Sequence, residues 1–354
     1  MTHQPHYTPQ DLIHFAKRCF ISSGLEASRA QIVANKMIEA DLMGHDTHGI
    51  RMLNRYLADI RQGNMVTDGE PEVISDRGPC ALWDARLLPG HWVLQRGIEL
   101  AIPRAKQYGS MMLGIRRSHH VGALNVHLTS IVEHGLIGIL WATDSKVRSV
   151  APFGGIDPVL TTDPIAAGIP TSGAPILIDT TTSLCSNALV KQTLERGEQL
   201  PSEMLKDNEG KPTRNPNALF TDPPGTILPL GGMTHGYKGY SLAMLVNVMS
   251  LALPGFGKAS GEKNEGIMLH IIDPDAFGGK EAFLQETDWM VDASRASRST
   301  SDSPIRLPGD RARELSKIRH DDGIPLENAI FENLTPYLQA HSIEAPHALQ
   351  RVSQ

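Results

Sequence analysis

Cysteine and long apolar runs are both scarce in this chain of 354 residues. The three cysteines, Cys19, Cys80 and Cys185, show no CxxC spacing, which argues against a disulfide framework and against a zinc site. No stretch approaches the ~20 apolar residues of a membrane span, and the N-terminus lacks the charged start and apolar core of a signal peptide. We therefore expect a cytoplasmic protein that is neither exported nor inserted into a membrane.

Clustered basic residues are missing as well. The formal net charge is −6, and no run of Lys and Arg occurs. Because phosphate backbones are bound by clustered positive charges, this composition argues against a broad nucleic-acid surface, and small molecules are the expected partners. With 40% apolar residues, the chain can bury a large core and is expected to divide into two or three lobes.

The dinucleotide fingerprint GxGxxG, which normally lies between a first strand and a helix, is also absent. The nearest string, GFGKASG from Gly255, has the wrong spacing and follows an expected helix instead of a strand. We interpret it as a mobile turn. Composition and periodicity by themselves therefore predict only a soluble α/β enzyme.

Helical periodicity is present through the first seventy residues. Thr8 is a plausible N-cap with Pro9 at the first helical position, and further helices are expected at about 26–43 and 50–62. From about residue 71, short apolar runs alternate with helical patterns, which indicates a mixed sheet covered by helices. Strands are expected at 111–115, 137–142, 165–170, 176–179 and 267–272, and helices at 92–108, 124–134, 184–196 and 238–251.

The chain is expected to form two domains. Residues 1–70 form a helical N-terminal lobe, with which the C-terminal helices of 310–354 pack, and residues 71–309 form an α/β domain. Residues 197–224 are rich in Pro, Asn, Asp and Gly and predict a long irregular loop. The Ser- and Arg-rich stretch 292–304 is expected to be mobile.

The segment GHDTHGI, residues 44–50, holds the first candidate for catalysis. It places His48 between Thr47 and Gly49 at an expected helix end. Histidine is the side chain best suited to exchange a proton near neutral pH, so His48 is a candidate general acid or base. The alternative is a helix-terminal histidine satisfied by backbone groups. Of the following Arg51 and Arg55, one is expected to face the pocket and bind a substrate carboxylate.

Further motifs follow in order: Ser118, His119, His120, Val121 and Gly122, then APFGG from Ala151, TTDP from Thr161, IDTTTS from Ile178 and GYKG from Gly236. In order and spacing, these motifs resemble the malate/L-lactate dehydrogenase type 2 family. That family contains NAD(P)-dependent 2-oxoacid and imino acid reductases without a Rossmann fold, including ureidoglycolate, sulfolactate and diketogulonate oxidoreductases. The resemblance covers about residues 39–326.

The resemblance implies a fold, a reaction and an assembly. A helical N-terminal lobe would join an α/β domain around a mixed sheet, with NAD or NADP as cofactor, and the chain would form a homodimer. The implied reaction is hydride transfer between nicotinamide and a small 2-hydroxy acid, its 2-oxo acid, or a cyclic imino acid. One alternative is a member that binds a dinucleotide without turnover. Another is a metal-dependent hydrolase or lyase built on His45, His48, His119 and His120, although no HExxH pattern accompanies them.

The resemblance also implies residue roles. His48 is the implied proton donor, supported by Thr47, and His120 is the second candidate for proton transfer and a substrate contact, with His119 structural. Thr162 is implied at the substrate, and Asp179 is implied to orient a histidine or bond the nicotinamide. No metal is implied. The implied cofactor-binding residues are Ile178, Asp179, Thr180, Thr181, Thr182, Ser183, Tyr237, Lys238, Gly309, Asp310 and Arg311.

Two of these assignments have a simpler interpretation. Thr181, Thr182 and Ser183 could form an ordinary helix cap, and GYKG could be a solvated turn before a helix.

Four positions depart from the family pattern. Asp144 and Asp163 stand where the family has asparagines, and Ala188 and Leu189 stand where it has glycine and lysine. An ionised aspartate can only accept hydrogen bonds, and a carboxylate added near a phosphate or substrate acid lowers affinity unless it is paired or protonated. We therefore expect Asp163→Asn to change the ranking of substrates, or the preference between NAD and NADP, more than it changes folding stability.

Overall fold

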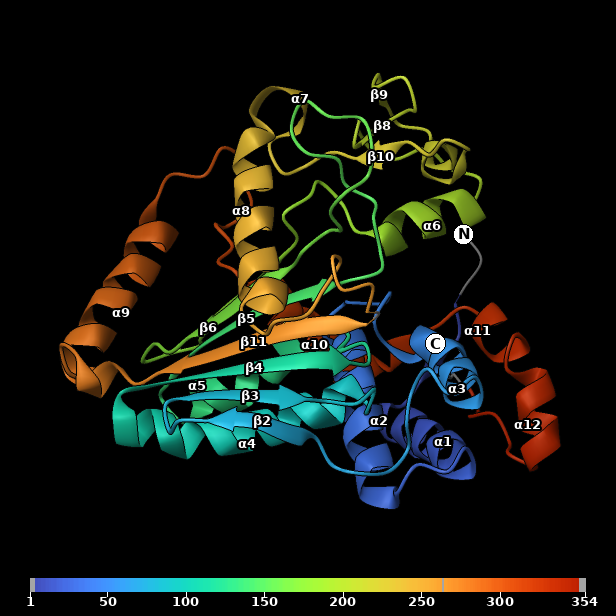
Figure 1. Ribbon diagram of the computed structural model, residues 1–354, viewed down its shortest axis with the longest axis horizontal. Coiled ribbons are helices and arrows are strands. Elements are labelled where there is room, and N and C mark those ends of the chain that lie inside the picture. The colour runs from blue at the N-terminus through green and yellow to red at the C-terminus, as the bar shows by residue number, and fades with distance from the viewer. Residues whose placement is uncertain (1–3, 263, 350–354) are drawn as a thin grey trace.

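A seven-stranded mixed sheet forms the centre of the computed structural model, which describes residues 4–262 and 264–349 (Figure 1). The strand order is β2-β3-β4-β11-β5-β6-β7. Strands β3 and β4 are parallel, and the other neighbouring pairs are antiparallel. This confirms the predicted α/β class. The strands are β2 (Glu72–Asp76), β3 (Cys80–Asp84), β4 (Ser110–Ser118), β5 (Ile137–Asp144), β6 (Ile165–Ile169), β7 (Ile176–Thr180) and β11 (Glu265–Ile272).

Helices cover both faces of this sheet. On one face lie α4 (Gly90–Tyr108) and α5 (Thr129–Glu133), and on the other lies α8 (Tyr237–Asn247), which continues as a π-helical turn over Val248–Ala252 (Figure 1). The central strands β4, β5 and β11 are mostly apolar because both of their faces are covered. Leu113 and Leu269 pack toward α4, whereas Trp141 and Met268 pack toward Val246 of α8.

The N-terminal helices have a separate core. Helix α1 (Pro9–Ser22) begins at the predicted cap, because Thr8 Oγ1 accepts from Asp11 N at 3.1 Å. The apolar stripes of α1, α2 (Ala27–Leu42) and α3 (Leu53–Arg61) pack together with residues 324–343. The C-terminal elements are α10 (Asp310–Asp322), which packs on α2, then β12 (Ile324–Pro325), α11 (Ala329–Glu332) and α12 (Thr335–His341); β12 pairs with β1 (His6–Tyr7).

A small second sheet corrects one sequence-based prediction. The stretch 197–224 is not only an irregular loop, because it contributes to a three-stranded sheet with its own apolar core. Each strand has two residues, too few for an alternating pattern to be readable in the sequence. The elements here are α6 (Asn187–Glu195), β8 (Leu205–Lys206), β9 (Pro212–Thr213), a 3₁₀ turn (Pro216–Phe220) and β10 (Thr226–Ile227).

The sequence also failed to predict α9 (Lys280–Ala296), and part of the stretch expected to be mobile belongs to this helix. Only Thr287 of α9 is buried, although Phe283, Leu284 and Val291 recur at helical spacing and offered a signal that the sequence analysis did not use. Among the described residues, no helix is long and apolar enough to cross a bilayer. The remaining elements are α7 (Gly232–His235) and 3₁₀ turns at Ile50–Met52, Asn125–His127 and Pro274–Ala276.

Candidate active site

The loop that carries His48 lies between α2 and the 3₁₀ turn at Ile50, as the sequence predicted. His48 N donates to His45 O at 2.8 Å, and Thr47 Oγ1 lies 2.7 Å from His48 Nδ1. A Cβ at Gly49 would lie 1.8 Å from Asp41 Oδ1, so only glycine fits beside that carboxyl. These contacts fix the direction of the imidazole and leave its Nε2 as the atom not held by Thr47.

The side chain of Asp41 holds this loop in place, a role that the sequence analysis did not assign to it. Its side chain is fully buried, and Asp41 Oδ2 accepts from Ile50 N at 2.7 Å. Burial raises the pKa of Asp41 to about 8. The available signal was its spacing, because Val33, Met37 and Asp41 follow one another at intervals of four and place a carboxyl on the apolar face of α2.

His120 lies directly beside His48. The two rings stack with centroids 5.7 Å apart and planes 14° apart. His120 follows the end of β4, and its Nδ1 is 2.6 Å from the hydroxyl of Tyr56 on α3. Its Nε2 faces Glu265 Oε1 of β11 at 3.9 Å. The structure therefore brings together the two histidines that the sequence singled out, and it adds Tyr56 and Glu265.

His119 points the other way. Its Nε2 lies 3.1 Å from Asp59 Oδ2, its side chain is buried, and its ring meets Tyr56 edge-on at 5.0 Å between centroids. These contacts connect β4 to α3 and give His119 a structural position.

The histidines in this region are held in the neutral form. Burial, followed by the interactions with His45 and Arg55, lowers the pKa of His48 to about 4. The pKa of His120 is lowered well below its usual value, first by burial and then by Arg55. A neutral His48 imidazole can accept a proton at Nε2 near neutral pH.

Asp179, at the end of β7, reaches the same loop through an intermediate residue. Its Oδ2 accepts from Asn125 N at 3.0 Å, and Asn125 Nδ2 lies 2.8 Å from His45 Nε2. Burial raises the pKa of Asp179, and the nearby His45 opposes that shift. Asp179 thus contacts the backbone of Asn125, and its connection to the GHDTHG motif runs through His45.

The two arginines after His48 have different surroundings. Arg51 pairs with Glu327 at 2.6 Å, and Glu327 also pairs with Arg196 at 2.9 Å. Arg55 has an exposed side chain and a longer contact of 3.5 Å with Asp59. The charge of Arg55 lowers the pKa of both His48 and His120.

Two of the motifs that the resemblance assigned to a cofactor lie side by side. Leu230 N donates to Thr182 O at 2.8 Å, and Gly239 N donates to Leu230 O at 3.0 Å, so the GYKG turn adjoins the end of β7. A Cβ at Gly239 would lie 2.6 Å from Thr182 O. Tyr237 and Lys238 are exposed at the start of α8.

The hydroxyl groups of IDTTTS bond locally. Thr181 donates to Ser183 O, Thr182 to Thr162 O, and Ser183 to Cys185 O, at 2.8 to 3.1 Å. The interpretation of these residues as a helix cap is wrong, because Ser186 caps α6 by accepting from Leu189 N. Ile178 and Thr180 lie on β7 itself, and Thr180 is exposed.

The segment Gly309 to Arg311 follows Pro308, which contacts β7 away from the end of that strand. Leu177 N donates to Pro308 O at 3.1 Å, about three residues or ~10 Å before the end of β7. Asp310 begins α10 and pairs with Arg313 at 2.6 Å, and it also accepts from Leu307 N. Asp310 therefore has structural partners of its own.

Both added carboxylates are bonded within the protein, which contradicts the premise that Asp163 faces a ligand. Asp163 has no exposed surface and accepts from Thr143 Oγ1 and from Asn247 Nδ2. Asp144 Oδ1 accepts from the backbone N–H groups of residues 146 and 147. Ala188 and Leu189 lie in the first turn of α6.

Comparison with known proteins identifies the family. The family model for malate/L-lactate dehydrogenase matches residues 7–335. The chain belongs to this family. The malate/(S)-sulfolactate dehydrogenase of Methanothermus fervidus is 31% identical over 330 residues, which cover 91% of this chain and 94% of that protein. This confirms the predicted family and its enzyme class, a dehydrogenase of hydroxy acids.

Solved structures of relatives have the same fold as this dehydrogenase. Malate dehydrogenase from Pyrococcus horikoshii matches with a TM-score of 0.87 and 28% identity, covering 97% of each chain. Delta1-piperideine-2-carboxylate reductase from Pseudomonas syringae matches with a TM-score of 0.82 and 28% identity, covering 94% of this chain and 99% of that chain.

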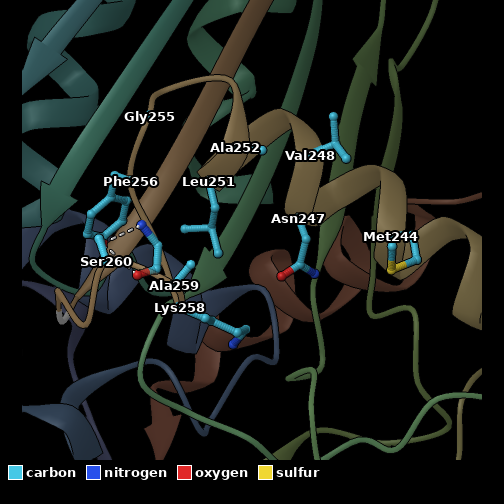
Figure 2. Close-up of a pocket in the computed structure, with 11 residues that line it drawn as sticks. Met244, Asn247, Val248, Leu251, Ala252, Gly255, Phe256, Lys258, Ala259 and Ser260 are labelled. Atoms are coloured by element: carbon cyan, nitrogen blue, oxygen red, sulfur yellow. Dashed lines mark hydrogen bonds between the residues drawn. The ribbon is translucent and has the colours of Figure 1, made fainter.

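Two pockets of the dehydrogenase flank the ends of α8. Figure 2 shows the first, of about 400 Å³, where Asn247 and Lys258 come from opposite walls. GFGKASG forms its rim, and Lys258 Nζ donates to Asp144 O and Val147 O at 3.0 Å. The second, of about 290 Å³, lies between the APFGG motif and residues 228–233, near Tyr237, whose ring is 5.8 Å from that of Phe153.

The histidines of the alternative metal site each contact a different residue. His45 contacts Asn125, His119 contacts Asp59, and His48 contacts Thr47. Within residues 4–262 and 264–349, no three His, Cys, Asp or Glu side chains are grouped so that they could hold a metal ion.

Proposed function

We propose that this dehydrogenase transfers a hydride between the nicotinamide of NAD or NADP and C2 of a small 2-hydroxy acid, or of its 2-oxo or cyclic imino counterpart. One observation carries the proposal: His48, held neutral and fixed at Nδ1, stacks on His120 at the end of a central strand. The relatives support it, because malate, sulfolactate and piperideine-2-carboxylate in their names are all small acids.

His48 moves the proton. Thr47 occupies Nδ1, so Nε2 is the atom that takes the proton from the hydroxyl of a hydroxy acid during oxidation and returns it during reduction. His120 is the second candidate for this step, because Tyr56 lies at its Nδ1 while its Nε2 has no hydrogen bond to Glu265, 3.9 Å away. It shapes the substrate pocket, together with Thr162 beside Thr182.

The cofactor would lie along the end of β7 and the start of α8, where it supplies or accepts the hydride when bound. The residues present fit a dinucleotide, because the exposed Lys238 offers a cation to a phosphate and Tyr237 offers a ring beside the pocket at Phe153. Residues 178–183 would hold the nicotinamide end, with residues 309–311 completing the site. Asp179 positions the loop of His48 through Asn125 and His45.

The substrate carboxylate would pair with Arg55. Its guanidinium is exposed and its charge acts on both imidazoles, whereas Arg51 already shares Glu327 with Arg196. A planar guanidinium matches a carboxylate bidentately.

A thermal-shift comparison with NADH and NADPH, followed by a reductase assay on 2-oxo acids and cyclic imino acids, tests this function. A cofactor at 100 times its dissociation constant should stabilise the protein by about 2.7 kcal/mol. A shift together with turnover supports the proposal. A shift without turnover on any acid would favour a binding protein, and no shift with either cofactor would overturn the proposal.

We also propose that the chain forms a homodimer in the cytoplasm, with the helical lobe of residues 1–70 and the α/β domain of 71–309 as its two parts. Support for the dimer comes from α8 and the π-helical turn after it, which expose Leu242, Met244, Leu245 and Val248. A stripe of this kind on a helix commonly packs against another surface. Light scattering should give twice the chain mass, and Leu245→Glu should halve it.

A further inference from the structure

Glu265 is a carboxyl at the candidate site to which no role has been given. It is the first residue of β11, and its Oε2 accepts from Val121 N at 3.1 Å. Its Oε1 lies 3.9 Å from His120 Nε2, which is too long for a hydrogen bond. Both side chains keep some exposed surface, 13% for Glu265 and 16% for His120, so a ligand can reach the space between them.

The charges around Glu265 make this position unfavourable for an anion. Asp144 lies directly across the β5–β11 pair from Glu265, and its carboxylate has the same sign. Arg55 opposes the charge of Glu265, but its side chain is more than half exposed and its attraction is screened by water. A second carboxylate or sulfonate of a substrate placed here would meet two protein carboxyls.

We propose that Glu265 selects the substrate, accepting a hydrogen bond from a hydroxyl or ammonium group on the carbon beside C2, or from a protonated imine at C2, and disfavouring a second anionic group. The inference rests on the proposed function and adds the substrate class: a monocarboxylic acid that carries a donor. A donor bound here satisfies the free oxygen of Glu265, whereas an anion leaves that buried oxygen unpaired and repelled.

The selection should depend on pH. Burial, followed by the charge of Asp144, raises the pKa of Glu265 to about 8. Below that value the empty site holds a neutral carboxyl, and above it a carboxylate that repels anions more strongly. The other titratable or charged groups facing Glu265 are His120, Tyr56 and Arg55, and the pKa values of His120 and Tyr56 are shifted away from this range. The preference for donors should therefore increase as pH rises through about 8.

Glu265→Gln isolates the charge. Glutamine keeps the shape and can still accept from Val121 N, so the strand end should stay in place, while the anionic acceptor is lost. Glu262→Gln is the matched control, because Glu262 lies three residues away, is exposed, and undergoes the same charge change.

The experiment compares oxamate, a monoanion with an amide donor, with oxalate, a dianion of similar size, by calorimetry on protein saturated with NADH or NADPH. At about pH 9, where Glu265 is ionised, wild-type protein should bind oxamate more tightly than oxalate. Glu265→Gln should lower this ratio about tenfold or more, which corresponds to about 1.4 kcal/mol, and Glu262→Gln should leave it unchanged. In wild type, the ratio should rise between about pH 6.5 and 9.

The outcomes separate the two proposals. If wild type reduces 2-oxo acids but the ratio is the same in Glu265→Gln, the selection by Glu265 is overturned and the proposed function stands. If Glu265→Gln does not fold, a wild-type ratio that stays flat across the pH range overturns the selection just as well. If wild type binds neither analogue and reduces no acid, both proposals fail.

Discussion

His48 carries the proton in the proposed reaction. His48→Ala should lower turnover by roughly 10² to 10⁴, because a positioned acid or base contributes about that factor, while NADH affinity should hardly change. Steady-state kinetics and a fluorescence titration of NADH measure the two effects. His14→Ala, at an exposed position on α1, is the control for loss of a histidine. A His48→Ala enzyme that kept more than about a third of wild-type turnover would transfer the role to His120.

The surroundings of Asp163 reverse the expectation that Asp163→Asn changes substrate ranking more than stability. Its buried carboxyl receives the Thr143 hydroxyl and the Asn247 amide. In Asp163→Asn, the side-chain N–H₂ would face one of these donors and could not accept from it. The lost hydrogen bond should cost about 1 to 3 kcal/mol of folding free energy. Urea unfolding measures this loss, with the exposed Asp157→Asn as control. The ranking of 2-oxo acids should stay the same, and a changed ranking at unchanged stability would restore the expectation from sequence.

At the scale of elements, the start of α8 is where the cofactor turn can be tested. Lys238→Ala should weaken dinucleotide binding, and the loss should shrink as salt rises, because an exposed charge pair is screened. Calorimetry at low and high ionic strength measures both. Lys106→Ala, at the end of α4, removes an exposed lysine elsewhere and should have no effect. Equal affinity of Lys238→Ala and wild type at low salt would mean that GYKG is only a turn.

The helices and strands also show which parts of the fold the sequence pattern could predict. Helices α1, α2 and α3 each bury an apolar stripe, and their bounds were predicted closely. The strands of the small sheet were missed because two-residue strands carry no periodic signal. Helix α9 was missed although Phe283, Leu284 and Val291 recur at helical spacing. The periodicity of 238–251 predicted one helix, whereas the observed helix ends in a π-helical turn.

For the whole molecule, buried titratable groups predict how stability depends on pH. Asp41 and Glu265 have folded pKa values of about 8, far above those of exposed carboxyls, so the stability they contribute is full at low pH and is lost progressively as pH rises toward about 8. The histidine pKa values, His48 among them, are lowered on folding, so their contribution is lost only as pH falls below about 6.5. Stability should therefore fall between about pH 6.5 and 8 and level off above that.

Urea unfolding at several pH values measures this dependence. Each of the two carboxyls can contribute a slope of up to about 1.4 kcal/mol per pH unit within its window. Asp41→Asn, which can still accept from Ile50 N, should flatten the curve, whereas the exposed Asp157→Asn should not. A constant or rising stability over this range would show that these carboxyls are ionised in the folded protein.

The sequence by itself determined the family, the mixed α/β class, the N-terminal helices and the position of His48 at a helix end, because each depends on residues close together in the chain or on motifs in a fixed order. Only the tertiary structure decided the surroundings of the site. Tyr56 meets His120 across 64 residues, Asn247 meets Asp163 across 84, and Glu265 meets Val121 across 144. Local patterns carry no record of such pairs, since the packing of strands and helices, not chain proximity, brings them within bonding distance.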